Sequence, residues 1–175
     1  IRKIAIPMYG RHLHHPDGSH SFLPYGKNDQ AIWSVSRGEL NSRQMDLPQK
    51  QGKAAIHFNT RCTGFDQGKD TVHLENTLTG ARSSASAGLF FGADGAFSAV
   101  RLQMQLSTDR FQYSQYYIPH GYKELHIPAA QGGTWAMEKN ALHIWPRGQF
   151  MLIALPNMDG SFTCTLFFPF EGKRS

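Results

Sequence analysis

The stretch that most constrains the fold of this chain runs from the apolar residues 87–91 through the glycine-rich segment 92–95 to Ser98. Glycine tolerates the positive φ that tight turns need, and Ser is a favoured helix N-cap. The stretch therefore predicts a buried strand, a tight turn that carries Asp94, and a helix that begins after Ser98. The residues alone leave two interpretations open: a turn at the end of a dinucleotide site, or an ordinary corner with an Asx-type turn.

Alternation of apolar and polar residues predicts strands in much of the remaining chain. Two extended arms, 4–13 and 21–25, flank a Pro-Asp-Gly turn and predict a hairpin. A helix is expected at 39–45, capped by Ser36 and ended by Pro48. A meander is expected from strands at 54–66, 71–78 and 82–91, and one antiparallel sheet from strands at 116–127, 135–137, 141–145, 150–155 and 162–168.

Composition narrows the class of protein. The 175 residues suffice for a domain with a real core. The net charge of +5 is spread along the chain without a basic stripe, which argues against nucleic-acid binding. There is neither a signal peptide nor an apolar stretch of bilayer length, so a cytoplasmic globular protein is expected. Cys62 and Cys164 lack metal-ligand spacing and are interpreted as reduced, buried thiols.

Three motifs carry a resemblance to a known family. The segment Gly-x-Asp-Gly followed by Ser-x-x-Arg resembles that of the class A FAD-dependent aromatic hydroxylases, and its residues here are Asp94, Gly95, Ser98 and Arg101. The stretches 113–125 and 140–167 are similar to the kynurenine 3-monooxygenase family within that class. The resemblance extends from residue 6 to residue 172.

The resemblance implies an α+β fold of the para-hydroxybenzoate hydroxylase type, incomplete in this chain. Residues 1–25 would form a hairpin of the substrate domain, 26–106 part of the FAD-binding domain, and 107–175 the antiparallel sheet of the substrate domain. The family's N-terminal Gly-x-Gly-x-x-Gly turn and C-terminal Gly-Asp segment do not occur here. The chain is therefore expected to be a central fragment that alone neither retains FAD nor turns over.

The implied activity is hydroxylation of L-kynurenine to 3-hydroxykynurenine with FAD as cofactor and NADPH and O2 as co-substrates, within tryptophan degradation. The expected location is the cytoplasm, or the mitochondrial outer membrane if an anchor follows in a longer protein. Two alternatives remain: a flavin hydroxylase of another aromatic acid, and a binding module for aromatic anions without catalysis. The oligomeric state is left undetermined.

The candidate substrate residues begin with Arg11, because a guanidinium forms a planar bidentate pair with a carboxylate. Tyr25 on the second hairpin arm adds a phenol donor, and both match the family's pattern. The alternative is a surface Arg with a Tyr packed over it. The resemblance also implies a ring-binding wall, formed by Leu142, Met151, Ile153, Leu155, Thr165 and Phe167, whose spacing of two would otherwise indicate only the core face of a sheet.

For the cofactor, the resemblance implies Arg37 near the flavin diphosphate or ring edge and a main-chain contact at Cys62, where the family usually has Leu. Asp94 and Gly95 complete the cofactor set. The histidines of the hairpin, His12, His14, His15 and His20, lack accompanying Cys or carboxylate ligands, so solvated turn residues are expected rather than a metal site. His120 and His143 fall in family motifs and are interpreted as structural or as positioning groups.

Overall fold

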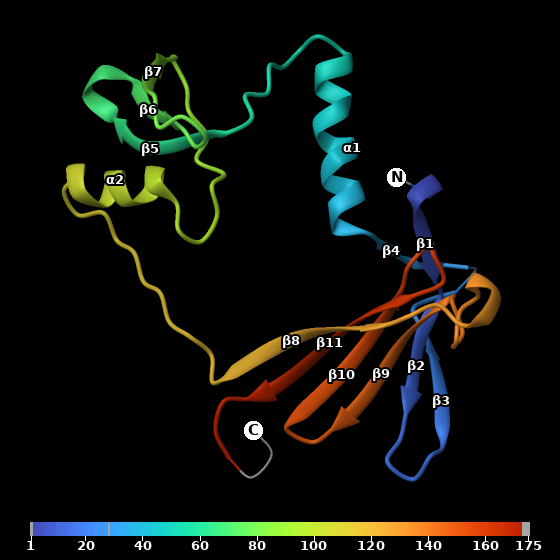
Figure 1. Ribbon diagram of the computed structural model, residues 1–175. Helices are drawn as coiled ribbons and strands as arrows, with labels where there is room; N and C mark the ends of the chain where they lie inside the picture. The colour runs from blue at the N-terminus through green and yellow to red at the C-terminus, as the bar shows by residue number, and fades with distance from the viewer. Residues whose placement is uncertain (1, 28, 173–175) are drawn as a thin grey trace. The chain divides into compact units, whose positions relative to one another are not determined.

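The computed structural model describes residues 2–27 and 29–172 (Figure 1). The chain divides into two compact units: unit 1 comprises Ile1–Gln51 with Tyr117–Ser175, and unit 2 comprises Gly52–Tyr116. Residues 26–51, which the sequence assigns to the FAD-binding domain, thus group with the substrate-domain segments. The assignment of these units to substrate and FAD domains stays a prediction.

Unit 1 is built on a six-stranded sheet with the order β3-β2-β9-β10-β11-β8, which Figure 1 shows as a fan of neighbouring arrows. Its strands are β2 (Gly10–His14), β3 (His20–Pro24), β8 (His120–Ile127), β9 (Ala141–Arg147), β10 (Phe150–Pro156) and β11 (Phe162–Pro169). All neighbouring pairs are antiparallel except β2 and β9, which are parallel. The prediction of one antiparallel sheet is confirmed for the strands β8, β9, β10 and β11, and β2 of the N-terminal hairpin adds a parallel pair at its edge.

The first arm of the expected hairpin is two strands rather than one. It breaks at Tyr9, so that β1 (Ala5–Met8) pairs with β4 (Ile32–Val35) in a separate two-stranded sheet, while β2 pairs with β3. The amide of Tyr9 donates to the carbonyl oxygen of Asn140, 2.9 Å away, which ties the break to the start of β9. Short 3-10 turns cover Arg2–Ile4 and Gln131–Gly133.

Helix α1 (Arg37–Lys50) follows β4 and is capped by Ser36, whose Oγ accepts a hydrogen bond from the amide of Glu39. The predicted cap is confirmed. The predicted end at Pro48 is wrong, since the helix continues to Lys50. Pro48 lacks the amide that would bond to the carbonyl of Gln44, but the last turn still closes through the hydrogen bond from the Gln51 amide to the carbonyl of Leu47 at 3.1 Å. Among the described residues, no helix is long and apolar enough to cross a membrane.

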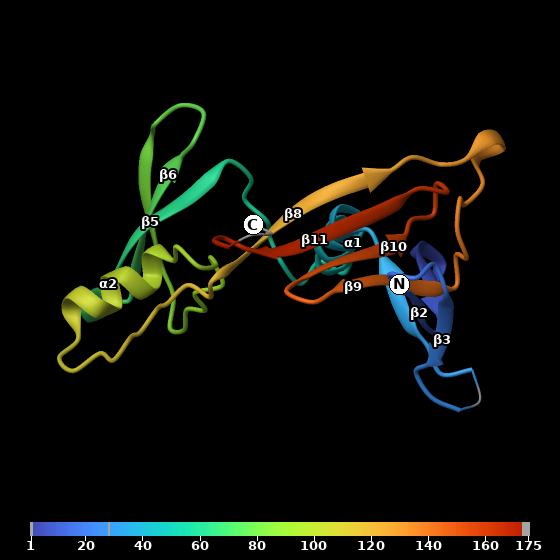
Figure 2. The ribbon, with the colours of Figure 1, turned by 90° about the horizontal axis from the view of Figure 1, so that it is seen from below.

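Unit 2 is a meander of β5 (Thr60–Asp66), β6 (Thr71–Asn76) and β7 (Arg82–Ser86), with a 3-10 turn at Gln67–Lys69 and helix α2 (Ala99–Ser107) beside β5 (Figure 2). The order of strands and the helix confirm the prediction. The expected strand at 87–91 is wrong: β7 ends at Ser86, and these residues find no partner strand within the described residues. The expected strand at 135–137 is also wrong, since those residues follow an isolated bridge between Ala130 and Thr134.

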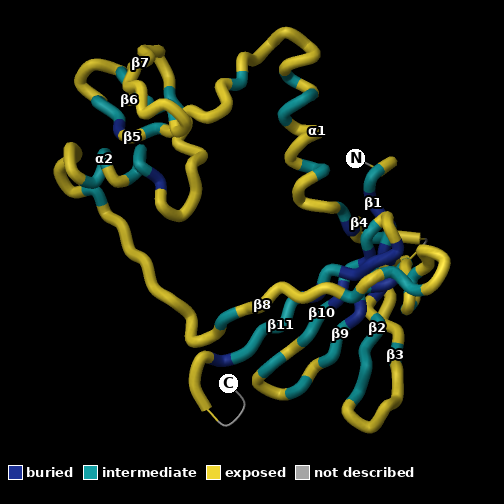
Figure 3. The backbone as a smooth tube through the Cα atoms, viewed as in Figure 1, coloured by how far each residue is buried: buried dark blue, intermediate teal, exposed yellow. Residues whose placement is uncertain are grey.

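The core of unit 1 lies on one face of the large sheet. Ala154, Phe162 and Cys164 are buried there, and five half-buried residues pack around them: Ile127, Trp135, Met137, Trp145 and Leu152. Figure 3 shows that buried backbone gathers in unit 1, whereas unit 2 is mostly exposed or half-buried. Burial of the Phe162 side chain contributes about 1.5–3 kcal/mol. The expected burial of free cysteines is confirmed for Cys164, while Cys62 is half-buried.

Position 160, in the turn between β10 and β11, requires glycine because of both its backbone conformation and its close neighbours. Its φ is +88°, and a Cβ at this position would lie 2.5 Å from the carbonyl oxygen of Gly133. This turn is also where the Trp135 indole donates to the carbonyl of Asn157 at 2.9 Å, so the turn and the loop before β9 are packed together.

We predict that Gly160→Ala destabilises the chain more than Gly18→Ala. Both positions have a positive φ, but a Cβ at Gly18, where φ is +84°, meets nothing within 4 Å. Each substitution carries a backbone cost of about 1–2 kcal/mol, and only Gly160→Ala adds the displacement of a carbonyl. Urea unfolding of the two variants measures the difference; equal losses of stability would contradict the close packing of this turn.

Candidate functional site

The register of the large sheet gathers the predicted substrate residues on one face, which we call the Arg11 face. Arg11 is opposite Leu142 in the parallel pair of β2 and β9. Across β10 and β11, Ile153 is opposite Thr165 and Met151 is opposite Phe167. Leu155 shares this face with Ile153, because side chains two residues apart in a strand point the same way. The core residues described above lie on the other face.

Arg11 and Tyr25 are in contact. The Arg11 guanidinium carbon lies 5.1 Å from the centre of the Tyr25 ring, within the range of a cation–π interaction. Arg11 is exposed and Tyr25 half-buried, so the cation keeps access to solvent. The two predicted carboxylate-binding groups therefore stand together at the β2–β3 edge of the sheet.

A cavity of about 700 Å³ opens in unit 1 on the Arg11 face. It is lined by Leu155 and Thr165, which belong to the predicted ring wall, and by Arg37, which belongs to the predicted cofactor set. The other predicted wall residues, Leu142, Met151, Ile153 and Phe167, share the face but do not line this cavity. Its remaining lining comes from the start of α1, from β8 and from the β10–β11 turn: Ser34, Val35, Ser36, Gly38, Glu39, Glu124, His126, Asn157, Met158, Asp159, Ser161 and Thr163.

Several polar residues of this cavity were not among the site residues predicted from the sequence. Thr163 and Glu124 lie on the Arg11 face, since Thr163 precedes Thr165 by two residues and Glu124 is opposite Thr165 in β8. The alternation of side chains along each strand indicates which residues share a face, but it does not tell which strands pair with one another. Asn157 donates from its amide to the hydroxyls of Ser161 and Thr163, each at 3.0 Å.

The electrostatics of the cavity are mixed. The first turn of α1 is the positive end of the helix dipole, and Arg37 is its first residue. On the opposite side, a hydrogen bond from the Ser161 hydroxyl holds the pKa of the Asp159 carboxyl below its usual value. The cavity thus carries the cation Arg37 and the carboxylate Glu39 near α1, and the carboxylate Asp159 near the β10–β11 turn.

In unit 2, the turn that carries Asp94 caps helix α2. Ser98 Oγ donates to Asp94 Oδ1 at 2.5 Å, and the amide of Ala99 donates to Oδ2 at 2.7 Å. Ser98 in turn accepts from the amide of Arg101 at 3.0 Å, which confirms the predicted N-cap. The Arg101 guanidinium donates to the carbonyl oxygen of Gly95 at 3.3 Å and to the next carbonyl along the turn.

The structure confirms one of the two interpretations that the sequence left open, a capped corner, while the cofactor role of Asp94 stays a prediction. The turn is a self-capped corner, and Gly95 has a φ of +82°, as a tight turn requires. Asp94 nevertheless remains exposed, with lone pairs beyond those used by Ser98 and the α2 amides. The Ser98 hydrogen bond is the largest cause that lowers the pKa of the Asp94 carboxyl, so it is ionised near neutral pH.

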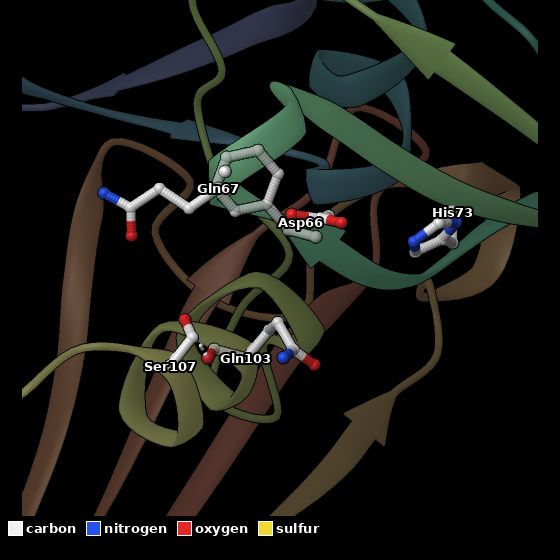
Figure 4. A pocket seen from close by; sticks show the side chains of 7 residues that line it. Asp66, Gln67, His73, Gln103 and Ser107 are labelled. Atoms are coloured by element: carbon white, nitrogen blue, oxygen red, sulfur yellow. Dashed lines mark hydrogen bonds between the residues drawn. The ribbon is translucent and has the colours of Figure 1, made fainter.

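A second cavity, of about 490 Å³, lies between β5, β6 and α2 in unit 2. Figure 4 shows Gln103 and Ser107 on the helix, with Asp66, Gln67 and His73 on the strand side. Asp66 already binds the amide and ammonium groups of Lys69 at 3.2 and 3.3 Å. Cys62 lies in β5 outside this lining, and its thiol donates to the carbonyl of Gly64.

The predicted cofactor residues fall into two groups. Arg37 belongs to unit 1 and lines the larger cavity, whereas Cys62, Asp94 and Gly95 belong to unit 2. Their shared role in binding one cofactor therefore stays a prediction. The predicted substrate residues all belong to unit 1; those in strands lie on one face of its sheet, and Tyr25, which follows β3, contacts Arg11.

The fold is shared with several solved flavoproteins. It is similar to a flavoprotein/dehydrogenase from Cytophaga hutchinsonii, with a TM-score of 0.72, 12% identity, and coverage of 94% of this chain and 40% of that one. It is also similar to Klebsiella pneumoniae HpxO complexed with FAD and uric acid (TM-score 0.65, 17% identity, 97% and 42% covered) and to P. aeruginosa PqsL in complex with 2-aminobenzoylacetate (TM-score 0.68, 15% identity, 96% and 44% covered). The chain thus has the fold of the FAD-dependent monooxygenases, in the incomplete form that the sequence predicted.

Sequence relatives identify the particular enzyme that the chain resembles. It is 48% identical over 99% of its length to the kynurenine 3-monooxygenase of Myxococcus xanthus, and 46% identical to those of Dictyostelium discoideum and Sus scrofa over 100% and 95%. The resemblance to kynurenine 3-monooxygenase is therefore confirmed along this chain. The chain spans 35–37% of the length of these three relatives. No family model matches it.

We predict that Asp94→Asn destabilises helix α2 by about 0.5–1.5 kcal/mol at pH 7, the typical net contribution of one hydrogen bond, because the Asn amide nitrogen cannot accept one of the two hydrogen bonds that Asp94 accepts from Ser98 and Ala99. The folded-state pKa of Asp94 is lowered, so its contribution to stability is present above the unfolded-state pKa of about 3.9 and is lost as the pH falls through the folded-state value. Amide hydrogen exchange of α2 at neutral pH and in acid measures this. The control is Asp109→Asn, at an exposed site beyond α2; equal effects of the two variants would contradict the capping role.

Proposed function

We propose that this chain supplies the substrate-binding sheet and part of the cofactor-binding region of a FAD-dependent monooxygenase that hydroxylates L-kynurenine to 3-hydroxykynurenine with NADPH and O2. The observation that carries the proposal is the identity of 46–48% to curated kynurenine 3-monooxygenases along 95–100% of the chain. The domain boundaries, the site residues and their roles are part of the same proposal.

The substrate is a zwitterionic amino acid with an aminobenzoyl ring. Arg11 would pair with its carboxylate through two parallel N–H donors, and the hydroxyl of Tyr25 would add a third. The Tyr25 ring, 5.1 Å from the guanidinium, keeps Arg11 in place without neutralising its charge. P. aeruginosa PqsL was solved with 2-aminobenzoylacetate, which, like kynurenine, has an aminobenzoyl ring and a carboxylate. That likeness supports the substrate class.

The ring would lie against the apolar wall of the Arg11 face. Leu142, Met151, Ile153, Leu155 and Phe167 contribute apolar surface, and Thr165 contributes one hydroxyl. Such a wall orients a flat ring and excludes water, which preserves a reactive oxygen species for the aromatic substrate. None of these side chains needs to act as an acid or a base, because the oxygen chemistry belongs to the cofactor.

The residues present fit FAD. Asp94 is an exposed, ionised carboxylate beside the positive-φ turn at Gly95, and it suits hydroxyl donors of the cofactor. Arg37, at the first turn of α1, suits a diphosphate, and the backbone at Cys62 offers a main-chain contact. Bound FAD, reduced by NADPH, supplies the electrons and activates O2. This chain's residues would hold the cofactor and exclude water.

The proposal is tested with the complete open reading frame that contains this chain, expressed and loaded with FAD. We predict kynurenine-dependent NADPH oxidation with formation of 3-hydroxykynurenine, measured by absorbance and mass spectrometry. A preparation that binds FAD but hydroxylates another aromatic acid in preference to kynurenine would overturn the substrate assignment. A preparation that binds kynurenine without oxidising NADPH would favour a binding module.

We predict that Arg11→Ala in that protein raises KM for L-kynurenine by about tenfold to several hundredfold, since a charge-assisted pair contributes about 1.5–3 kcal/mol. FAD occupancy should be unchanged. Tyr25→Phe should have a smaller effect in the same direction, and Arg11→Lys an intermediate one, because Lys keeps the charge but lacks the planar fork.

The control for this prediction is a decarboxylated kynurenine analogue. It should be a poor substrate of the wild type and lose little more with Arg11→Ala. If the analogue loses as much as kynurenine does, Arg11 maintains the hairpin rather than binding the carboxylate.

A further inference from the structure

The face of the large sheet opposite Arg11 carries a cluster of histidines that the sequence analysis interpreted as turn residues. That interpretation is wrong for three of them, because His12 and His14 lie in β2 and His20 lies in β3. His14 is directly opposite His20, and His12 is directly opposite His143 of β9. The register thus brings together, on one face of the sheet, histidines from the three strands β2, β3 and β9.

The rings of this cluster are close enough to share a ligand. The ring centres of His12 and His14 are 4.9 Å apart, and those of His14 and His20 are 4.7 Å apart. One ring nitrogen from each of His12, His14 and His20 can be chosen so that all three lie within 4.8 Å of one another. His12 and His14 are half-buried and His20 is exposed, so the cluster opens to solvent on one side.

His143 fixes the orientation and the tautomer of His14. Nε2 of buried His143 lies 2.8 Å from the carbonyl oxygen of Glu138, which can only accept, so this nitrogen carries the proton. In the neutral ring, Nδ1 of His143 is then an acceptor, and it lies 2.9 Å from Nε2 of His14. His14 therefore donates from Nε2 and keeps its lone pair on Nδ1.

This arrangement resembles the support that metal-binding histidines usually have, in which the non-ligating N–H is held by an acceptor. The Trp145 ring stacks against His14 at 4.1 Å between centres and limits its rotation further. One ligand of the cluster is thus held in place before any ion binds.

We propose that His12, His14 and His20 form a binding site for a divalent transition-metal ion, represented by Zn²⁺, that leaves at least one coordination position open to solvent. Three imidazoles without a carboxylate suit Zn²⁺, Cu²⁺ or Ni²⁺ rather than Mg²⁺ or Ca²⁺. With Zn–N bonds of about 2.0–2.1 Å, tetrahedral ligand atoms lie roughly 3.4 Å apart, so the rings must close by about 1 Å. Exposed His20 and half-buried His12 supply this movement around His14.

The ion would cross-link β2 to β3, the hairpin that also carries Arg11 and Tyr25 on its other face. Because the three ligands converge only in the folded chain, binding would stabilise the folded state by mass action. The site is separate from the Arg11 face and does not depend on the proposed hydroxylase activity.

The test uses the 175-residue chain without an affinity tag, freed of metal with a chelator and titrated with ZnCl2 at pH 7.5 by calorimetry. We predict saturable binding of one Zn²⁺ per chain and a raised melting temperature. His20→Gln should weaken Zn²⁺ binding by about tenfold or more. Because His20 is exposed, this variant should fold as the wild type does, and circular dichroism checks this. Titration with Co²⁺ should give the visible absorption of a nitrogen-bound ion in the wild type and not in His20→Gln.

The matched control is His15→Gln. His15 belongs to the same hairpin, but its ring binds the Ser21 hydroxyl at 2.8 Å and it alternates away from His14. This variant should bind Zn²⁺ as the wild type does. Absence of saturable binding, or equal affinities for the wild type and His20→Gln, or an equal loss in His15→Gln, would overturn the proposal.

Discussion

The parallel pairing of β2 with β9 is the interaction on which the rest of unit 1 depends. It joins the N-terminal hairpin to a strand from the last third of the chain, with Arg11 opposite Leu142 and His12 opposite His143. Side chains alternate along a strand, so a slip of one residue would move every hairpin side chain to the other face. This single register puts the proposed substrate residues on one face and the histidine cluster on the other.

Specific contacts hold that register. The side chain of Asn140 donates to the carbonyl of Pro7 at 2.8 Å, and the Arg147 guanidinium donates to the carbonyl of His14 at 2.8 Å. A side-chain hydrogen bond therefore stabilises each end of the β2–β9 pairing. Gly10 at its start has no room for a side chain, because a Cβ would lie 2.5 Å from the carbonyl of Leu23. The pairing is thus set by close backbone approach as much as by apolar burial.

The two units differ in how they are stabilised. Unit 1 has a buried cluster around Phe162, whereas unit 2 depends on local hydrogen bonds such as the capping of α2 by Asp94 and Ser98. The apolar run that the sequence predicted as a buried strand is largely exposed, with Leu89 at 70% and Phe91 at 86%. Local capping can be predicted from a few neighbouring residues, but a buried strand also needs partner strands, which the described residues do not provide for this run.

The sequence by itself determined the local features: the Ser36 and Ser98 caps, the turns, the alternation of the strands and the motifs that resemble kynurenine 3-monooxygenase. These depend on residues close together in the chain. Only the tertiary structure decided that Arg11 meets Tyr25 beside the ring-wall strands, that Glu124 and Thr163 line a cavity with Arg37, and that three histidines converge. The physical reason is that strand periodicity tells which residues share a face of one strand, while the partner and register of each strand are fixed by contacts between distant segments.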